Sequence, residues 1–239
     1  MYQLDSFKQA LEELEIQLSE KQINQFIQYY ELLVEWNKVM NLTGITEWEE
    51  VVQKHFVDSL ALIHAIELTE SYKVLDLGTG AGFPGIPLKI AFPHLEIVLL
   101  DSLNKRIKFL NEVIAQLGLT GISAYHGRAE EFAKKTEYRE QFDLVVSRAV
   151  ANLSTLSEYC IPYVKIGGYF VSYKSGDVQE ELEKSEKAID ILGGCLEDVE
   201  EFTLPQSDIS RTLVVIEKEQ STKKKYPRMG GKPSKEPLS

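Results

Sequence analysis

Residues 73–87 read Lys-Val-Leu-Asp-Leu-Gly-Thr-Gly-Ala-Gly-Phe-Pro-Gly-Ile-Pro, and the rest of the chain can be placed relative to them. Val74, Leu75 and Leu77 form a short apolar run of the kind that is buried on both faces of a parallel sheet. Three glycines at alternate positions follow, where a backbone turns sharply or approaches a ligand closely. Two prolines then suit the first turn of a helix. This order of strand, glycine turn and helix is typical of a nucleotide-binding α/β unit.

The glycine turn matches two cofactor templates. Gly80, Gly82 and Gly85 have the spacing of the dinucleotide fingerprint, which predicts an NAD(P)-dependent oxidoreductase. Gly78, Gly80 and Gly82, preceded by Asp76, have an arrangement that resembles motif I of the S-adenosylmethionine methyltransferases. A sulfonium cofactor gains from carboxylate and carbonyl oxygens, whereas a pyrophosphate is favoured by bare backbone N–H groups. Asp76 therefore favours methyl transfer, and the oxidoreductase remains an alternative.

A second carboxylate supports a cofactor site. Residues 96–100 read Glu-Ile-Val-Leu-Leu and predict a strand that ends at Asp101, 19 positions after Gly82. A carboxylate about 20 residues beyond the glycine turn, at the tip of the second strand, receives hydrogen bonds from a ribose diol. We therefore predict that Asp101 binds the ribose of the cofactor.

The composition is that of an ordinary globular protein. The chain has 239 residues, 44% of them apolar, which allows one large domain or a domain with a smaller appendage. No apolar run approaches membrane-spanning length, so we expect a cytoplasmic protein with no membrane partner. Cys160 and Cys195 lie far apart with no zinc or disulfide pattern, which predicts two reduced core residues and no metal site.

The net charge of −11 is unevenly distributed. Residues 223–239 contain six Lys or Arg and one Glu, a net charge of +5, so the other 222 residues carry −16. This asymmetry predicts an interaction arm, and a solvated, disordered terminus is the alternative. The basic residues of the arm are Lys223, Lys224, Lys225, Arg228, Lys232 and Lys235.

Periodicity predicts the order of helices and strands. Residues 1–66 predict amphipathic helices, with capping boxes at Ser19/Gln22 and Thr46/Glu49. Helices and strands then alternate: helix 104–117, strand 122–125, a strand from 142 into a polar tip, helix 152–163, strand 168–174 and helix 177–192. Residues 196–202 and 212–217 predict two strands in succession, the closing signature of the methyltransferase sheet.

These elements predict an α/β protein with a Rossmann-like, seven-stranded, mostly parallel sheet that ends in an antiparallel hairpin. We expect three parts: an N-terminal helical extension over 1–66 that packs on the core, a cofactor-binding methyltransferase core over 67–219 and a basic tail over 220–239.

Several polar residues stand at positions where they could face a pocket. Arg148, at the carboxyl end of the fourth strand, points into the crevice where open α/β sheets bind ligands. It should meet an anion, either a cofactor carboxylate or a phosphate, and a structural salt bridge to a helix carboxylate is the alternative. His55 and Asp58, three apart on one helical face, predict a polar pair, and Asn41 ends a helix in a polar cluster. Glu130 follows the third strand, either as a helix cap or beside the base of the cofactor.

With these stretches together, the chain resembles the ribosomal small-subunit methyltransferase G family, also called glucose-inhibited division protein B, over nearly its whole length. The stretches that carry the resemblance are 36–45, 55–60, 74–87, 147–149, 211–217 and 226–235. The last one, Tyr-Pro-Arg-Met-Gly-Gly-Lys-Pro-Ser-Lys, is the most specific, because many activities share the core methyltransferase motifs. The resemblance implies S-adenosylmethionine-dependent methylation of guanine N7 in a conserved decoding-region loop of 16S rRNA.

The resemblance also implies the site residues. The cofactor would be lined by Gly78, Phe83, Asp101, Ala129, Glu130 and Arg148, beside Asp76, Gly80 and Gly82 of the glycine turn. The functional site would contain Asn41, His55, Arg128, Arg148 and Arg211. The partner would be 16S rRNA or the small ribosomal subunit, contacted by the basic arm of a monomeric protein. A non-catalytic RNA-binding or assembly module that keeps the sheet is the second alternative.

The chemistry fits the residues that the sequence offers. Guanine N7 is an unprotonated acceptor, so it can attack a methyl group in line without first losing a proton. The sequence contains no obvious nucleophile, triad or metal cluster, which favours a mechanism based on positioning, with no general base.

Overall fold

The computed structural model of the protein describes residues 2–148 and 151–238. A seven-stranded sheet in the order β3-β2-β1-β4-β5-β7-β6 forms its centre. β1 to β5 are parallel, and β7 runs antiparallel to both β5 and β6. The strands are β1 (Lys73–Leu77), β2 (Glu96–Asp101), β3 (Ile122–His126), β4 (Phe142–Ser147), β5 (Val164–Lys174), β6 (Gly194–Thr203) and β7 (Ser210–Lys218). The predicted fold class, including the closing antiparallel pair, is confirmed.

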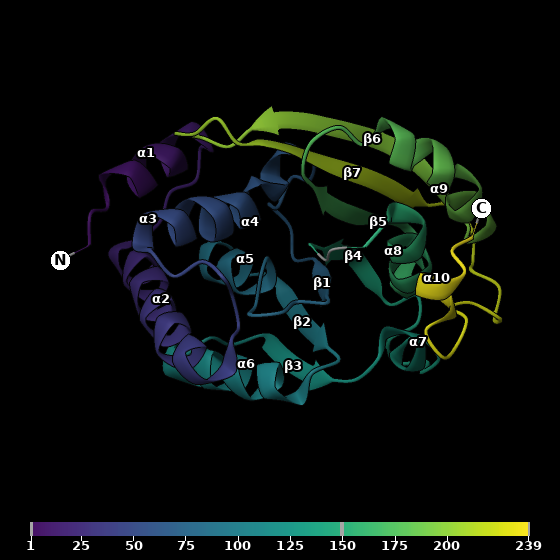
Figure 1. Ribbon diagram of the computed structural model, residues 1–239, viewed down its shortest axis with the longest axis horizontal. Coiled ribbons are helices and arrows are strands. Elements are labelled where there is room, and N and C mark those ends of the chain that lie inside the picture. Colours follow the sequence, from purple (N-terminus) through teal and green to yellow (C-terminus); the bar gives the residue numbers. More distant parts are fainter. Residues whose placement is uncertain (1, 149–150, 239) are drawn as a thin grey trace.

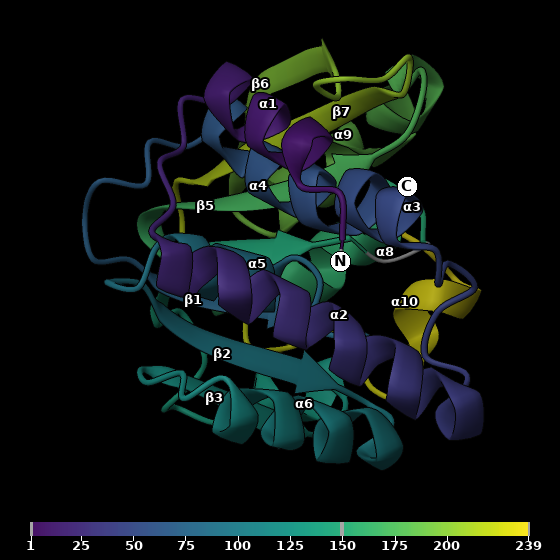
Figure 2. The same cartoon turned by 90° about the vertical axis from the view of Figure 1, so that its left-hand side faces the viewer.

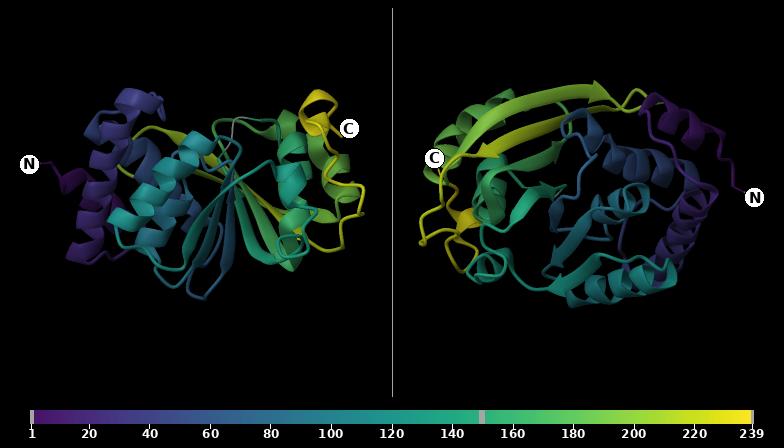
Figure 3. Two further views of the ribbon diagram at one scale, coloured as in Figure 1. Left: turned by 90° about the horizontal axis from the view of Figure 1, so that it is seen from below. Right: turned by 180° about the vertical axis from the view of Figure 1, so that it is seen from behind.

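Helices cover both faces of the sheet (Figure 1; Figure 3, left). One face carries α1 (Asp5–Glu13), α2 (Glu20–Met40), α3 (Trp48–Val51), the π-helix η1 (Val52–Val57), α4 (Asp58–Leu60), the 3₁₀-helix η2 (Ala61–His64), α5 (Gly85–Ala91) and α6 (Asn104–Gln116). The other carries α7 (Ala129–Phe132), α8 (Leu153–Cys160), the 3₁₀-helix η3 (Ile161–Tyr163), α9 (Gln179–Ile191) and α10 (Lys232–Lys235). Figure 2 looks onto α2, with β3 at the lower edge of the sheet and β6 at the upper edge. The direction of the strand order reverses between β1 and β4, which is where open α/β sheets bind ligands.

The N-terminal helices pack directly against the glycine turn. Ser19 caps α2 with the predicted box, since its side chain accepts a hydrogen bond from the Gln22 N–H and its own N–H donates to Gln22 Oε1 at 2.9 Å. From α2, the buried Tyr29 donates its hydroxyl to Ala81 O at 2.5 Å. The helical extension therefore holds the cofactor-type turn in place.

Two details of the sequence interpretation are wrong. The second capping box does not form, because α3 begins only at Trp48, after Glu47, and no side chain caps it. Cys160 is buried as predicted, but Cys195 is exposed on the edge strand β6. β6 is the last strand of the sheet among the described residues, and no residue along it is fully buried, which accounts for the exposure.

The C-terminal tail is folded onto the body of the protein. Arg139 donates hydrogen bonds to Tyr226 O at 2.9 Å and to Thr222 O at 2.7 Å, and Tyr226 and Pro233 are buried. The alternative of a disordered terminus is therefore wrong for residues 220–238.

The described residues contain neither a helix fit to cross a membrane nor a group of potential metal ligands. No helix in 2–148 or 151–238 combines the length and the apolar character needed to cross a membrane. Across these same two stretches, three or more His, Cys, Asp or Glu side chains nowhere group as they would around a metal ion.

Candidate active site

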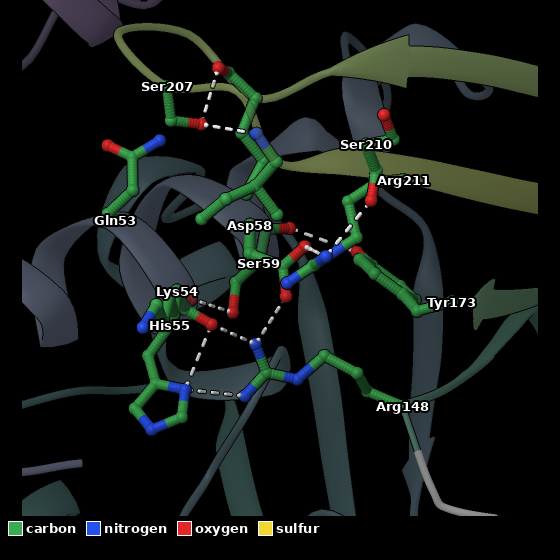
Figure 4. A network of polar contacts seen from close by, with 12 residues as sticks. Gln53, Lys54, His55, Asp58, Ser59, Arg148, Tyr173, Ser207, Ser210 and Arg211 are labelled. Carbon is green, nitrogen blue, oxygen red and sulfur yellow. Dashed lines mark hydrogen bonds and ion pairs between the residues drawn. The ribbon is translucent and has the colours of Figure 1, made fainter. Parts of the chain in front are cut away.

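One buried carboxylate holds two arginines at the carboxyl-terminal edge of the sheet (Figure 4). Asp58, only 4% exposed, accepts Arg148 Nη1 on Oδ2 and Arg211 Nε on Oδ1, each at 2.8 Å. Arg148 follows β4 and Arg211 lies at the start of β7, so the three residues come from chain positions up to 153 apart. Charge-assisted hydrogen bonds of this kind are short and directional. Asp58 therefore fixes the direction of both guanidinium groups.

Arg148 also fixes His55. Its Nη1 donates to Lys54 O at 3.0 Å, and its Nη2 lies 3.2 Å from His55 Nδ1. The contact with Arg148, which only donates, requires a lone pair on His55 Nδ1 and the ring proton on Nε2, 3.0 Å from Thr43 Oγ1, whereas the contact of Nδ1 with Lys54 O, also at 3.0 Å, requires a proton on Nδ1. The predicted direct pair of His55 and Asp58 is therefore wrong, because Arg148 lies between them.

The aromatic ring of Phe83 packs against both His55 and Arg148. The His55 ring is stacked on Phe83, with 4.4 Å between the ring centroids, and the Arg148 guanidinium lies 5.1 Å from the centroid of the same ring. Phe83 belongs to the glycine turn and is predicted to line the cofactor. It thus contacts both His55 and Arg148. It connects the cofactor turn to the functional residues.

A π-helix places His55 and Lys54. The apolar pattern predicts an ordinary helix through residues 52–63, but the structure divides it into α3, η1, α4 and η2. π-turns are rare and occur frequently at functional sites. In this one, Lys54 O accepts Arg148, and His55 O accepts the Ser59 hydroxyl at 2.5 Å. The Lys54 carbonyl group thus bonds to Arg148, and the His55 carbonyl group bonds to Ser59, the residue that follows Asp58.

The cluster lies in a cleft of about 630 Å³ with a basic lining. Its charged lining residues are Lys54, Asp58, Arg148, Lys174, Glu181 and Arg211. Four of these six side chains are cationic, although the whole chain carries a charge of −11. Lys174 is paired with Glu181, and the two arginines share Asp58, so the lining keeps a net charge of 4 − 2 = +2, which favours an anionic ligand.

A second cavity, of about 600 Å³, opens at the tips of β1, β2 and β3. The predicted cofactor residues in its lining are Gly78, Asp101, Ala129 and Glu130, and the lining also contains Arg106, Arg128, Tyr159, Gly231 and Ser234. Asp101 is 3% exposed and accepts the N–H groups of Gly80 at 3.0 Å and Leu103 at 2.9 Å, together with Arg106 Nη1 at 3.1 Å. Arg106 Nη1 also lies 3.5 Å from the other oxygen, Oδ1, so all of the roughly four acceptor positions of this carboxylate face a donor, and a ligand hydroxyl would have to replace the long Arg106 contact.

Asp76 has a different place from the one the sequence predicts. It is fully buried and does not line the second cavity, and its Oδ2 accepts Thr79 Oγ1 at 2.6 Å and the Gly85 N–H at 2.8 Å. Burial raises the pKa of this carboxyl group to about 6. Its main contacts therefore hold the glycine turn. Its second oxygen, Oδ1, is buried and has no protein partner in the described part of the chain.

Two glycines of the turn, Gly80 and Gly82, have conformational and packing roles. Gly80 and Gly82 have φ of +63° and +102°, which side chains rarely allow. A Cβ on Gly82 would lie 2.6 Å from Ile86 Cδ1 and 2.8 Å from the Tyr29 hydroxyl. Their requirement for glycine is therefore explained by the fold, and their contact with a cofactor stays a prediction.

The five residues predicted for the functional site are not all brought together. His55, Arg148 and Arg211 share the first cleft, whereas Arg128 lies at the second cavity, 3.8 Å from Glu130. Asn41 lines neither; it ends α2 with φ of +52° and is exposed. Ala149, the last residue of the motif at 147–149, lies outside the described residues.

Residues 22–210 match the family described as rRNA small subunit methyltransferase G (GidB). This chain belongs to that family. It is similar to "Ribosomal RNA small subunit methyltransferase G" of Lachnoclostridium phytofermentans, with 59% identity over 98% of this chain and 96% of the relative. The protein of the same name from Clostridium novyi is 51% identical over 98% and 96%.

Solved structures share the fold at low sequence identity. TYW2 of M. jannaschii, solved in complex with AdoMet, has a TM-score of 0.54 at 14% identity and covers 70% of this chain and 77% of its own. TrmN from Thermus thermophilus has a TM-score of 0.52 at 16% identity, over 70% of this chain and 53% of its own.

Membership of the methyltransferase G family confirms the predicted class, an S-adenosylmethionine-dependent rRNA methyltransferase. The NAD(P)-dependent oxidoreductase and the non-catalytic RNA-binding module are therefore wrong as readings of this chain. The glycine spacing that suggested the former belongs to a turn in which Gly82 and Gly85 pack against Ile86, Tyr29 and Leu99.

The half-buried, neutral His55 should make the free energy of unfolding depend on pH. Burial, followed by the charge of Arg148, lowers the pKa of His55 from 6.5 to about 4. Its contribution to stability is thus fully present above pH 6.5 and is lost as the pH falls toward 4, because only the unfolded chain binds a proton in this window. Asp76 acts with the opposite sign between pH 3.8 and about 6, so wild type must be compared with His55→Gln. Urea unfolding gives the free energy of unfolding at pH 5 and at pH 7.5. The decrease in this free energy from pH 7.5 to pH 5 should be smaller for His55→Gln than for wild type. An equal loss in both proteins would contradict the neutral ring.

Proposed function

We propose that this protein methylates N7 of a guanine in a decoding-region loop of 16S rRNA. The observation that supports this most is the pair of arginines fixed by Asp58 in a basic cleft, beside a cavity that suits a nucleoside. The first cleft and the second cavity lie at the ends of neighbouring strands. β1 pairs with β4, and at their ends Ser147 Oγ donates to Leu77 O at 2.8 Å. A cofactor and a polyanionic substrate could thus be held side by side.

The second cavity fits the adenosyl part of S-adenosylmethionine. Its volume is within the usual range for small-molecule sites, about 300–1,000 Å³. In this assignment Asp101 accepts the ribose hydroxyls, and Ala129 and Glu130 lie beside the base. Asp76, which is fully buried outside the lining of this cavity, would act on the cofactor through the glycine turn that it holds. Arg148 forms an ion pair with a helix carboxylate, Asp58 of α4, which is the structural alternative for this residue. We propose that it also meets either the carboxylate of the cofactor or a phosphate of the RNA.

No residue has to remove a proton from the target atom. S-adenosylmethionine supplies a methyl group on a sulfonium, and guanine N7 already carries a lone pair. The side chains of the cleft therefore act by orientation: Asp58 directs Arg148 and Arg211, and the neutral His55 ring is held between Arg148 and Thr43. Holding two reactants in a productive geometry supplies a large part of a rate enhancement.

The RNA must present an unpaired or rearranged guanine. The major groove of A-form RNA, where N7 lies, is too narrow for side chains. The cations of the first cleft would bind the backbone around such a guanine, with the exposed Arg128 at the neighbouring cavity as a further contact. We further propose that the protein is monomeric and, because its family acts on ribosomal RNA, that it is cytoplasmic.

Asp101→Ala should weaken the binding of S-adenosylhomocysteine by about 1.5–3 kcal/mol, the value of a hydrogen bond to a charged group. Isothermal titration calorimetry on the folded variant measures this loss. Asp143→Ala is a matched control, because Asp143 also accepts a backbone N–H, that of Lys73 at 2.6 Å, but lies near the opposite end of the strands. Wild-type affinity in folded Asp101→Ala would remove Asp101 from the cofactor site.

The lysines 223–225 should bind RNA at a distance from the target base. β7 is antiparallel to β5, so the chain leaves β7 at the edge of the sheet where the parallel strands begin, about 20 Å from their tips. Replacing all three lysines by Gln should reduce the slope of log affinity against log salt by about 2–3. The control variant replaces three exposed lysines elsewhere by Gln: Lys8, Lys21 and Lys184. It removes the same charge and should leave the salt slope unchanged. Equal slopes for wild type and the 223–225 variant would contradict this contact.

A further inference from the structure

We infer that the C-terminal segment Pro227–Leu238 forms one wall of the cofactor cavity, on its adenosine side, and must be docked for the methyl donor to bind. This rests on the proposed function, because it takes the cavity at the tips of β1 to β3 as the donor site. Gly231 and Ser234 line that cavity together with Gly78, Asp101 and Glu130. The chain segment that the sequence suggested as an RNA arm thus reaches the predicted cofactor residues.

An ion pair between the half-buried Arg228 and the buried Glu158 fastens the segment to the body. Glu158, on α8, is 0% exposed, and it accepts Arg228 Nη2 at 2.7 Å, Arg228 Nε at 2.9 Å and the Arg228 backbone N–H at 2.7 Å. A forked arginine–carboxylate pair of this kind fixes orientation as well as position. The Arg228 charge is therefore balanced inside the protein, and the lysines of the tail are left as the candidates for RNA contact.

Further hydrogen bonds continue along α8. Thr155 Oγ1 donates to Pro233 O at 3.0 Å, and the hydroxyl groups of Tyr159 and Ser234 lie 3.2 Å apart. Thr155, Glu158 and Tyr159 all belong to α8, and α10 packs against this helix (Figure 1). The position of the segment is thus set by a helix of the core.

The docked segment contacts Glu130, the residue that is expected beside the adenine base of the cofactor. The Gly231 N–H donates to Glu130 Oε1 at 3.3 Å, and Glu130 is only 5% exposed. If the segment moved away, Glu130 would lose this donor, and the cavity would lose the wall formed by Gly231 and Ser234. The motif at 226–235, which is the most specific part of the family resemblance, therefore acts in cofactor binding.

Gly231→Ala tests the wall with a matched control. Gly231 has φ of +70° and Gly118 has φ of +62°, and in both cases no atom lies within 4 Å of the position of an added Cβ. Alanine therefore introduces a similar backbone strain at both sites, but Gly118 follows α6, away from the cavity. Calorimetry with S-adenosylhomocysteine should show a binding constant weakened about 3- to 10-fold for Gly231→Ala and unchanged for Gly118→Ala.

The double variant Glu158→Gln/Arg228→Gln removes the forked ion pair, and so weakens the docking of the segment, without leaving a buried charge. We expect it to bind S-adenosylhomocysteine and 5′-methylthioadenosine at least about tenfold more weakly, by similar factors, because both ligands contain the adenosyl group. Wild-type affinity in the folded double variant and in Gly231→Ala would overturn the inference while the cofactor site stands. A loss confined to S-adenosylhomocysteine would also overturn it, since the segment would then act on the amino-acid end. If wild type bound neither ligand, the proposed function would fail together with the inference.

Discussion

Arg148→Lys should lower methyl transfer at saturating cofactor and RNA by at least about 100-fold, with little change in the thermal midpoint. Arg148 bonds Asp58, Lys54 O and His55 Nδ1 at the same time from one planar group. A lysine keeps the charge but is a single point donor on a flexible stem, so it cannot bond to all three. Misplacement by about 1 Å in such a site costs on the order of 100-fold in rate. Initial rates of methyl incorporation into small-subunit RNA measure the effect.

Arg148→Gln separates geometry from charge. If the planar arrangement of the cluster is what matters, Lys and Gln at this position should be impaired to a similar extent. If charge alone matters, the Lys variant should keep a third or more of the wild-type rate and the Gln variant should be far slower. That second pattern would contradict the orientation mechanism.

Arg228→Ala should reduce the free energy of unfolding by about 3–5 kcal/mol, the usual consequence of removing one partner of a buried ion pair. The loss is expected because Glu158 is 0% exposed and Arg228 supplies the side-chain donors to its carboxylate in the described structure. Urea unfolding measures the loss.

The charge-free pair Glu158→Gln/Arg228→Gln should recover most of that stability, because no ion is then buried without a partner. A double-mutant cycle gives the coupling energy between the two residues. Additive effects of the single changes would show that the pair does not hold the tail.

The parts of the fold that the sequence predicted depend on residues that are close together in the chain. The glycine turn, the strand ending at Asp101 and the two successive strands near the end each have their signal within about twenty residues. The capping box at Ser19 is of the same kind, because cap and partner lie three residues apart. The Thr46 box had the same local pattern, but α3 begins two residues later, at Trp48.

What the sequence did not show are contacts between distant residues. The sequence pairs Asp58 only with its neighbour His55, since its actual partners Arg148 and Arg211 lie 90 and 153 residues away. The charge of the basic tail predicts an interaction arm, and the sequence gives no sign that Glu158, 70 residues earlier in the chain, neutralises Arg228. The π-helix cannot be recognised either, because its apolar spacing is that of an ordinary helix.

The most direct test of the proposed function is the identity of the methylated nucleoside. Small-subunit RNA methylated by the purified protein is digested to nucleosides, which are separated and identified by mass spectrometry against standards. We expect 7-methylguanosine as the single new product, and its near absence with Arg148→Lys. A methyl group on a ribose oxygen, on cytosine or on an exocyclic amine would contradict the proposed function.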